Sequence, residues 1–401
     1  MTRLVAFSDA HLLIQAEWIS DEEVKLPEAE EVLDDFSRAI KEVEKVKPEA
    51  VILGGDIFDY RTKSGRKVAH REGEKYMPEI RDILGNFAEN CNCKIYAIKG
   101  NHDSIPVLKS VEKMLHGKFF FICDRLFNIN GLRVFFMKSR YEPGDYDLKG
   151  FEPPSADLLV MHEQLPVSGM PGLYIDLLHE LSERFKLIIN GHMHFYEKSI
   201  LGIPNVIQLP AFIPSREIKN SWMYKYRWSY ESDTVDFQER QSPFGFIVIE
   251  DVEDLNKVYF KRYTPQYKIV HVEIVGRKPE EYLKGLKKIY DILIEREDSE
   301  KLKIWVKVNA SKIVIDKLLW PEVRKYPNLC TRDILHYLYP IEAPPFPPPT
   351  ELKLEGKAFT LSELEEAVMS SLRDPLKKDF AKSLFETIFT PERMRRKEID
   401  K

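Results

Sequence analysis

The sequence predicts a layered α/β fold, because short apolar segments alternate with amphipathic helical patterns over residues 4–200. Each of five predicted strands ends at a motif that contains Asp, Asn or His. These strands cover 4–8, 50–53, 94–98, 157–160 and 187–189. Loops that follow the carboxyl ends of strands are where open α/β sheets bind ligands. A functional site is therefore expected along one sheet edge.

The helices between these strands follow from hydrophobic periodicity. Apolar residues recur at helical spacing from Ala29 to Val43, and Pro48 ends this helix. Residues 66–90 predict one or two helices, broken near Pro78. Four further strands lack helices between some of them and predict a second, partly antiparallel sheet packed on the first. They cover 133–137, 205–209, 245–249 and 258–262.

The length of the chain favours two or three domains. Residues 1–264 are expected to form the main domain. Residues 265–340 predict a small α/β unit, with a strand at 269–274, a helix at 279–296 and a strand at 303–308.

The C-terminal part of the chain predicts a different organisation. The proline-rich residues 341–350 predict a stiff linker, and residues 351–401 a helical segment in which Thr360 and Glu363 form a capping box. Apolar residues recur every four positions after 375, and this stripe is expected to dock on the first domain or on a partner protein.

Composition excludes several classes of protein. The chain has 401 residues and a net charge of -5, so it lacks a global nucleic-acid-binding charge. Its 4 cysteines show no disulfide framework and no zinc spacing. No apolar segment reaches the roughly 20 residues that a membrane span needs. We expect a cytoplasmic protein with reduced thiols that binds polyanions only through local basic residues and metal ions.

The five strand-end motifs contain residue types that bind divalent metals. They read Asp9-Ala10-His11, Gly54-Gly55-Asp56-Ile57-Phe58-Asp59, Gly100-Asn101-His102-Asp103, Met161-His162-Glu163 and Gly191-His192-Met193-His194. Taken alone, most of these motifs also fit ordinary turns or buried polar residues. Their joint presence in this order favours a metal centre.

The motifs divide into two predicted sets of ligands. One ion is expected to bind Asp9, His11, Asp56 and His194, and the other Asp56, Asn101, His162 and His192. Mixed imidazole, carboxylate and amide ligands fit manganese, iron or zinc better than magnesium. Two such ions about 3.5–4 Å apart can stabilise the attacking and leaving oxygens of a phosphoryl displacement. The predicted chemistry is therefore two-metal phosphoester cleavage.

These motifs resemble those of the calcineurin-like metallophosphoesterase superfamily, over roughly residues 1–250. The resemblance implies an α-β-β-α sandwich, here with a small α/β capping domain and a C-terminal helical segment. It also implies that Asp56 bridges the metals and that His102, which is not a ligand, meets the scissile phosphate. Asp59 or Asp103 is then expected to orient the imidazole of His102.

Within the superfamily, the layout is similar to that of the SbcD-type nuclease of DNA double-strand-break repair. The similarity rests on the motifs, on the small unit after residue 265 and on the helical C-terminus behind a proline linker. It implies a manganese-dependent DNA nuclease that forms a homodimer through helices near 66–90 and 104–116. It also implies an SbcC-type ATPase partner bound by the C-terminal helices, and association with the nucleoid.

Other functions stay open at the level of sequence. A phosphodiesterase or phosphatase acting on a nucleotide or another small phosphoester would use the same motifs. A metal-free scaffold is disfavoured because no expected ligand is missing. A protein phosphatase is disfavoured because Tyr60 follows Asp59 and because the third motif ends in Asp103.

Aromatic residues alternate with other residues between Trp222 and Tyr230, which predicts a strand with one aromatic face. Together with Arg216, Lys225 and Arg227, this face could stack unpaired bases of DNA. The favoured interpretation is that the aromatic face packs on a neighbouring element.

Overall fold

Two six-stranded sheets carry the strands that end at the sequence motifs. The structure is a computed structural model that describes residues 3–12, 27–59, 62–63, 66–67, 76–139, 153–165, 175–215 and 221–336. All of these residues lie in one unit, residues 1–338. The predicted linker at 341–350 and the predicted helical segment at 351–401 lie outside the described residues.

The first sheet has the strand order β16-β15-β1-β2-β5-β6. Its strands are β1 (Leu4–Phe7), β2 (Ala50–Leu53), β5 (Lys94–Ala97), β6 (Phe119–Phe121), β15 (Gly245–Ile249) and β16 (Val258–Arg262). The first four run parallel to one another, whereas β15 pairs antiparallel with both β1 and β16. The prediction that 245–249 and 258–262 belong to the second sheet is therefore wrong. Strand β15 takes the position beside β1, and β16 pairs with the other edge of β15.

The second sheet has the order β11-β12-β10-β9-β8-β7. Its strands are β7 (Arg125–Ile129), β8 (Leu132–Phe136), β9 (Ala156–Met161), β10 (Phe185–Asn190), β11 (Glu197–Lys198) and β12 (Val206–Gln208). Strands β8, β9, β10 and β12 are parallel, and β7 and β11 add antiparallel edges. The strands before His162 and His192 thus lie in this sheet, and not in the sheet that carries Asp9 and Asp56.

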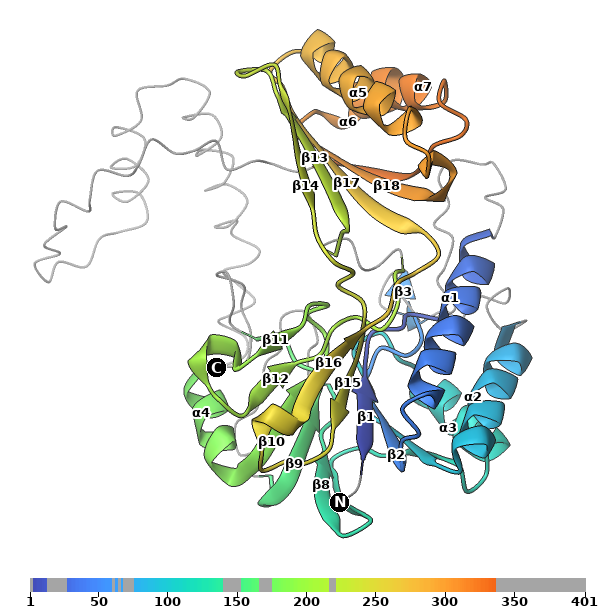
Figure 1. Ribbon diagram of the computed structural model, residues 1–401, viewed down its shortest axis with the longest axis vertical. Coiled ribbons are helices and arrows are strands. Elements are labelled where there is room, and N and C mark those ends of the chain that lie inside the picture. Colours follow the sequence, from blue (N-terminus) through green and yellow to red (C-terminus); the bar gives the residue numbers. More distant parts are fainter. Residues whose placement is uncertain are drawn as a thin grey trace, which may run out of the picture. The chain divides into compact units, whose positions relative to one another are not determined.

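Helices cover the outer face of each sheet. Figure 1 shows α1 (Pro27–Glu44), α2 (Met77–Cys91) and α3 (Ile105–Met114) on one side, and α4 (Ile175–Arg184) on the other. Separate apolar cores fill the three interlayer spaces, one between α1–α3 and the first sheet, one between the sheets, and one under α4. The predicted α-β-β-α sandwich is confirmed. The predicted helix over 66–90 begins only at Met77, and residues 66–67 form the strand β4 (Arg66–Lys67), paired with β3 (Thr62–Lys63).

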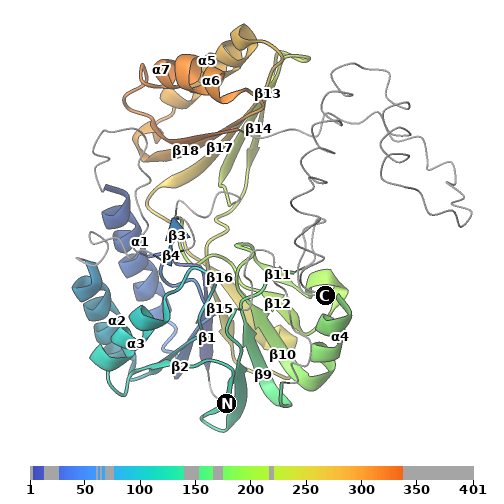
Figure 2. The ribbon, with the colours of Figure 1, turned by 180° about the vertical axis from the view of Figure 1, so that it is seen from behind.

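A third sheet forms a smaller lobe with its own apolar core. Its order is β14-β13-β17-β18-β19, and its strands are β13 (Tyr224–Ser229), β14 (Val235–Glu239), β17 (Lys268–Val275), β18 (Leu302–Val308) and β19 (Cys330–His336). One face is covered by α5 (Pro279–Ile294), α6 (Lys312–Val314), the π-helix η5 (Ile315–Leu319) and α7 (Trp320–Val323), as Figure 2 shows. We call residues 221–240 and 268–336 the small lobe. Strands β13 and β14 precede residue 265, so the sheets do not divide at the predicted domain boundary.

Three 3-10 turns complete the described elements: η2 (Ile200–Gly202), η3 (Leu255–Lys257) and η4 (Ser299–Lys301). No helix among the described residues is long and apolar enough to cross a bilayer.

The aromatic strand packs into the core of the small lobe. Tyr224, Tyr226 and Trp228 are buried beneath α5, where a Cβ atom on Gly285 would lie 2.3 Å from the Trp228 ring. Burial removes these rings from any role in stacking on bases. Of the predicted DNA contacts, Lys225 forms an ion pair with Glu273 at 2.9 Å, Arg227 is exposed, and Arg216 lies outside the described residues.

Candidate metal centre

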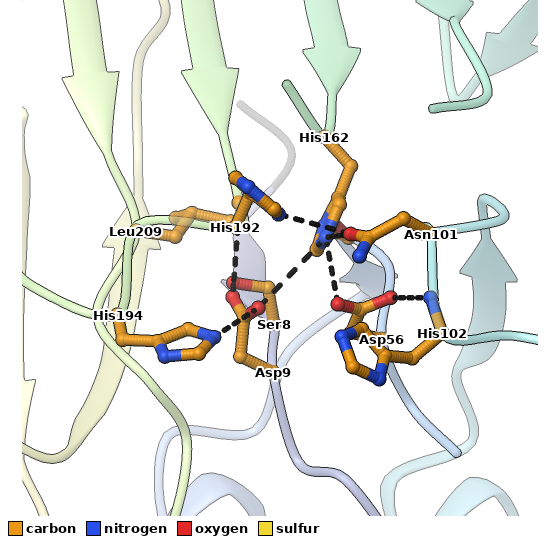
Figure 3. Close-up of polar contacts among 12 residues, drawn as sticks. Ser8, Asp9, Asp56, Asn101, His102, His162, His192, His194 and Leu209 are labelled. Atoms are coloured by element: carbon orange, nitrogen blue, oxygen red, sulfur yellow. Dashed lines mark hydrogen bonds and ion pairs between the residues drawn. The ribbon is translucent and has the colours of Figure 1, made fainter. Parts of the chain in front are cut away.

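The loops after β1 and β2 are joined by backbone hydrogen bonds, and these bonds bring the first two motifs together. The Asp9 N–H donates to the Gly55 carbonyl at 3.0 Å, and the His11 N–H donates to the Asp56 carbonyl at 3.0 Å. The loops after β5, β9 and β10 approach the same place from both sheets, as Figure 3 shows. All seven predicted ligands therefore meet at one edge of the sandwich, although the strands before them belong to two different sheets.

Much of the backbone at this edge is left-handed. Five of the seven predicted ligands have positive φ: Asp9 (57°), His11 (45°), Asp56 (50°), His192 (78°) and His194 (59°). Residues other than glycine rarely adopt this backbone conformation. The strain costs of order 1–3 kcal/mol per residue and is found mostly at functional sites. The surrounding packing therefore holds the ligands in place against a local energetic cost.

Two glycines allow the loops to approach one another closely. A Cβ atom at Gly100 would lie 2.1 Å from Asp56 Oδ1, and one at Gly191 would lie 2.5 Å from His162 Nδ1. Only a residue without a side chain fits at these positions. These two glycines thus allow the side chains of Asp56 and His162 to lie directly against neighbouring backbone.

The first cluster contains Asp9, His11 and His194. Their candidate ligand atoms all lie within 4.8 Å of one another. Asp9 Oδ1 is 3.2 Å from His194 Nε2, and His11 Nε2 is 3.4 Å from the same nitrogen. His11 and Asp9 are buried. This cluster corresponds to the first predicted ligand set.

The second cluster contains Asp56, His162 and His192. Asp56 Oδ2 lies 3.0 Å from His162 Nε2 and 3.9 Å from His11 Nε2, so this carboxylate stands between the two clusters. The Asn101 side-chain oxygen lies 3.2 Å from His162 Nε2 and 2.9 Å from His192 Nδ1. These positions match the second predicted set, with Asp56 shared.

Three of the predicted ligands, Asp9, His11 and His192, have the protonation state that suits cation binding. Burial lowers the pKa of His11 to about 4 and that of His192 to about 3, so both imidazoles are neutral near pH 7. Although burial opposes the shift, His194 and His162 lower the pKa of Asp9 to about 2. Burial would lower the pKa of His162, but Asp56 and Asp9 raise it to about 10, so this imidazole is protonated near pH 7 and must release a proton to bind a metal. Deprotonated carboxylates and neutral imidazoles are the forms that bind metals.

Three buried atoms of the site lack a hydrogen-bond partner among the described residues: Asp9 Oδ1, His11 Nδ1 and Asp56 Oδ2. The two carboxylate oxygens face histidine nitrogens at 3.2 and 3.0 Å but accept no hydrogen bond of good geometry, and burying them in this way is costly. A divalent ion would satisfy both carboxylates at once. The residues present therefore fit a pair of divalent ions with mixed nitrogen and oxygen ligands.

His102 lies beside the clusters, and Asp59 holds its imidazole. His102 Nδ1 is 2.8 Å from Asp59 Oδ1, and Asp59 is buried. Asp59 thus occupies the orienting position for which the sequence left two candidates. Asp103 instead accepts hydrogen bonds from the backbone N–H groups of Phe58 and Gly100, both at 2.9 Å. It joins the loop that follows β2 to the loop that carries His102.

Sequence reasoning missed a buried amide network that supports the histidine loops. Gln164 Oε1 lies 3.0 Å from His192 Nε2. The Asn190 amide donates to the Glu163 carbonyl at 2.9 Å and accepts from the Glu163 N–H at 2.8 Å, and Gln208 contacts the same amide at 2.8 Å. Gln164 follows His162 by two positions, as His11 follows Asp9 and His194 follows His192 in the first and fifth motifs. This shared spacing could have indicated a role for Gln164 in the site. Asn190 and Gln208 carry no such signal because their role exists only where β10 and β12 pair.

Comparison with known proteins connects this geometry to a family. Residues 2–196 match the family described as calcineurin-like phosphoesterase. The chain is also similar to a DNA double-strand break repair protein Mre11 of Methanocaldococcus jannaschii, with 26% identity over 283 residues. That match covers 63% of this chain and 65% of the relative.

Among solved structures, similar chains include an archaeal phosphodiesterase and a dimetal phosphatase from Danio rerio. The first has 12% identity and a TM-score of 0.28, and it covers 59% of this chain and 99% of the other. The second has 14% identity and a TM-score of 0.32, and it covers 52% of this chain and 87% of the other.

Proposed function

Since residues 2–196 belong to the calcineurin-like phosphoesterase family, we propose that this chain is a manganese-dependent DNA nuclease that processes double-strand breaks. The similarity to a protein named for DNA double-strand break repair supports DNA as the substrate. That similarity extends over 283 residues, beyond the part that matches the family.

The observation that carries the proposal is the pair of clusters joined by Asp56. Asp9, His11 and His194 would hold one ion, His162, His192 and Asn101 the other, and Asp56 both. When bound, two divalent ions supply an activated water and offset charge that develops on the phosphoryl oxygens. The imidazole-rich ligand set supports manganese over magnesium.

His102 would act on the phosphodiester directly. Its Nδ1–H donates to Asp59, which fixes the ring, and Nε2 would meet the substrate. A carboxylate at this position also stabilises positive charge on the ring. His102 would then stabilise negative charge on the phosphate or donate a proton to the leaving oxygen.

The C-terminal segment and two helices of the sandwich are the proposed sites of partner binding. We propose that the chain works as a homodimer, with α2 and α3 in the interface, and with an SbcC-type ATPase bound by the C-terminal segment. Arg227, exposed on β13, and Lys225 on the same strand would contact the DNA backbone. A cytoplasmic location close to the nucleoid follows from this substrate.

The test is incubation of the purified chain with labelled linear duplex and single-stranded DNA, in the presence of Mn²⁺ or a chelator. We expect cleavage with Mn²⁺, none with the chelator, and none by the His102→Ala variant, which controls for a contaminating nuclease. Product lengths would reveal polarity and the preference for ends. Hydrolysis of nucleotides or of bis(p-nitrophenyl) phosphate without any cleavage of DNA would instead establish an enzyme for small phosphoesters.

A further inference from the structure

One face of α1 contacts the small lobe and the connector that leads to it. Asp35 Oδ1 accepts a hydrogen bond from the Tyr263 hydroxyl at 2.6 Å and one from the Gln266 N–H at 3.1 Å. Tyr263 and Gln266 lie between β16 of the sandwich and β17 of the small lobe. Glu31 lies one turn before Asp35 on α1, so both carboxylates face the same way.

Glu31 pairs with two cations from neighbouring strands of the small lobe. Its Oε2 accepts hydrogen bonds from Lys303 on β18 and from Arg332 on β19. The side chains of Lys303 and Arg332 are only 7% and 14% exposed, and Lys303 Nζ lies 3.9 Å from the centre of the Tyr267 ring. One carboxylate therefore lies between two largely buried positive charges and offsets the repulsion between them.

A small cavity borders this cluster. Glu31, Lys303 and Arg332 line a small cavity of about 30 Å³ together with Ser215 and Trp305. Ser215 Oγ and Trp305 Nε1 are buried and have no hydrogen-bond partner among the described residues. Apolar packing continues beside the cavity, because Trp305 belongs to the same core cluster as residues of α1. The ion cluster thus adds polar contacts between α1 and the small lobe to the apolar contact made by Trp305.

The small lobe also touches the metal centre. Ser221 is buried, and its hydroxyl donates to the backbone carbonyl of His194 at 2.8 Å. Two residues later, the Met223 N–H donates to the Ile269 carbonyl at 2.9 Å, at the start of the third sheet. The position of the small lobe is therefore connected to the loop that carries a predicted ligand.

We propose that Glu31 is a positioning residue that holds the small lobe against the sandwich so that duplex DNA can reach the metal centre. This inference rests on the proposed nuclease function. A long duplex needs the sandwich and the small lobe to be held in a fixed relative position, whereas a small phosphodiester needs only the metal centre. Glu31 therefore determines activity on DNA and leaves the chemistry unchanged.

The test compares Glu31→Gln with Asp34→Asn in the full chain. Asp34 lies on the same helix and forms an exposed ion pair with Arg38, with side chains 51% and 53% exposed, so this control removes an equal charge at the surface. For Glu31→Gln we expect kcat/KM on linear duplex to fall at least about tenfold, mainly through KM, because two buried cations lose their partner. Hydrolysis of bis(p-nitrophenyl) phosphate should change by less than about twofold, as for a surface substitution. Asp34→Asn should change neither activity.

A second variant separates positioning from loss of folding. Glu31→Gln combined with Lys303→Met removes one negative charge from α1 and one positive charge from β18. We expect this double variant to recover most of the duplex activity, because only one buried cation then lacks its partner. Limited proteolysis should cleave the connector 263–267 faster in Glu31→Gln than in the double variant. Wild-type duplex activity in Glu31→Gln would overturn the inference, and so would an equal loss on both substrates in a folded variant. Failure of the proposed function looks different, because the wild-type chain itself would then not cleave DNA.

Discussion

The contact between His102 and Asp59 leads to a quantitative prediction for Asp59→Asn. The substitution preserves size and removes the charge that faces His102 Nδ1 at 2.8 Å. Hydrogen bonds to charged groups contribute about 1.5–3 kcal/mol. The His102 side chain is 22% exposed and Asp59 only 1%, so solvent screens the pair little. At about 1.4 kcal/mol per decade of rate, kcat should fall roughly 10- to 100-fold.

The assay measures kcat on bis(p-nitrophenyl) phosphate and Mn²⁺ binding by titration calorimetry on the same preparations. Metal affinity and stoichiometry should stay at wild-type values, because Asp59 is outside both predicted ligand sets. Asp103→Asn is the matched comparison. It should lower thermal stability, because a carboxamide has one acceptor oxygen for the two N–H groups that Asp103 now accepts. Wild-type kcat in Asp59→Asn, or a kcat loss that tracks lost metal, would refute the reasoning.

Four further predictions concern the centre and the small lobe. His102→Ala should abolish DNA cleavage while Mn²⁺ and DNA binding persist, measured by calorimetry and gel shift; an active variant would contradict the assigned role. Asp56→Ala should remove Mn²⁺ binding by calorimetry, because this carboxylate stands between both clusters, and unchanged stoichiometry would exclude bridging. Gly191→Ala should weaken Mn²⁺ binding and lower Tm, because the new methyl would lie 2.5 Å from His162 Nδ1. Burial lowers the pKa of His271 from 6.5 to about 3, so between these pH values the imidazole is protonated in the unfolded chain and neutral in the folded chain. Stability should then fall as pH drops from 6.5 toward 3, by about 1.4 kcal/mol per pH unit for this proton. Urea unfolding of His271→Gln should show a shallower decline, and an identical slope would show that His271 contributes nothing.

The fold was predictable where the pattern was local. The helix of Ala29–Val43 and the parallel strands β1, β2 and β5 follow from apolar periodicity and short apolar segments. Sheet membership was not predictable in the same way. Strand β15 has no local feature that selects β1 as its partner over a strand of the second sheet, because pairing depends on which edge stays open after the chain has folded.

The small lobe illustrates the same limit. The alternation in β13 correctly predicts a strand with one buried aromatic face. It cannot show that this strand joins β17, which follows about forty residues later, nor that α5 covers the rings. Burial against α5, which only the tertiary structure establishes, is what removes the aromatic rings from a DNA-contacting role.

The amino-acid sequence alone determined the chemistry of this protein, since residue type and spacing decide which atoms can bind a metal. Five short motifs predict seven ligands in two sets, and their resemblance to the calcineurin-like superfamily implies the separate role of His102. The tertiary structure decided what depends on distance between remote segments: Asp59 as the partner of His102, the amide network of Asn190, and the ion cluster of Glu31. Such contacts join residues far apart in the chain, as Glu31 and Arg332 are at 301 positions, and no local pattern of side chains encodes them.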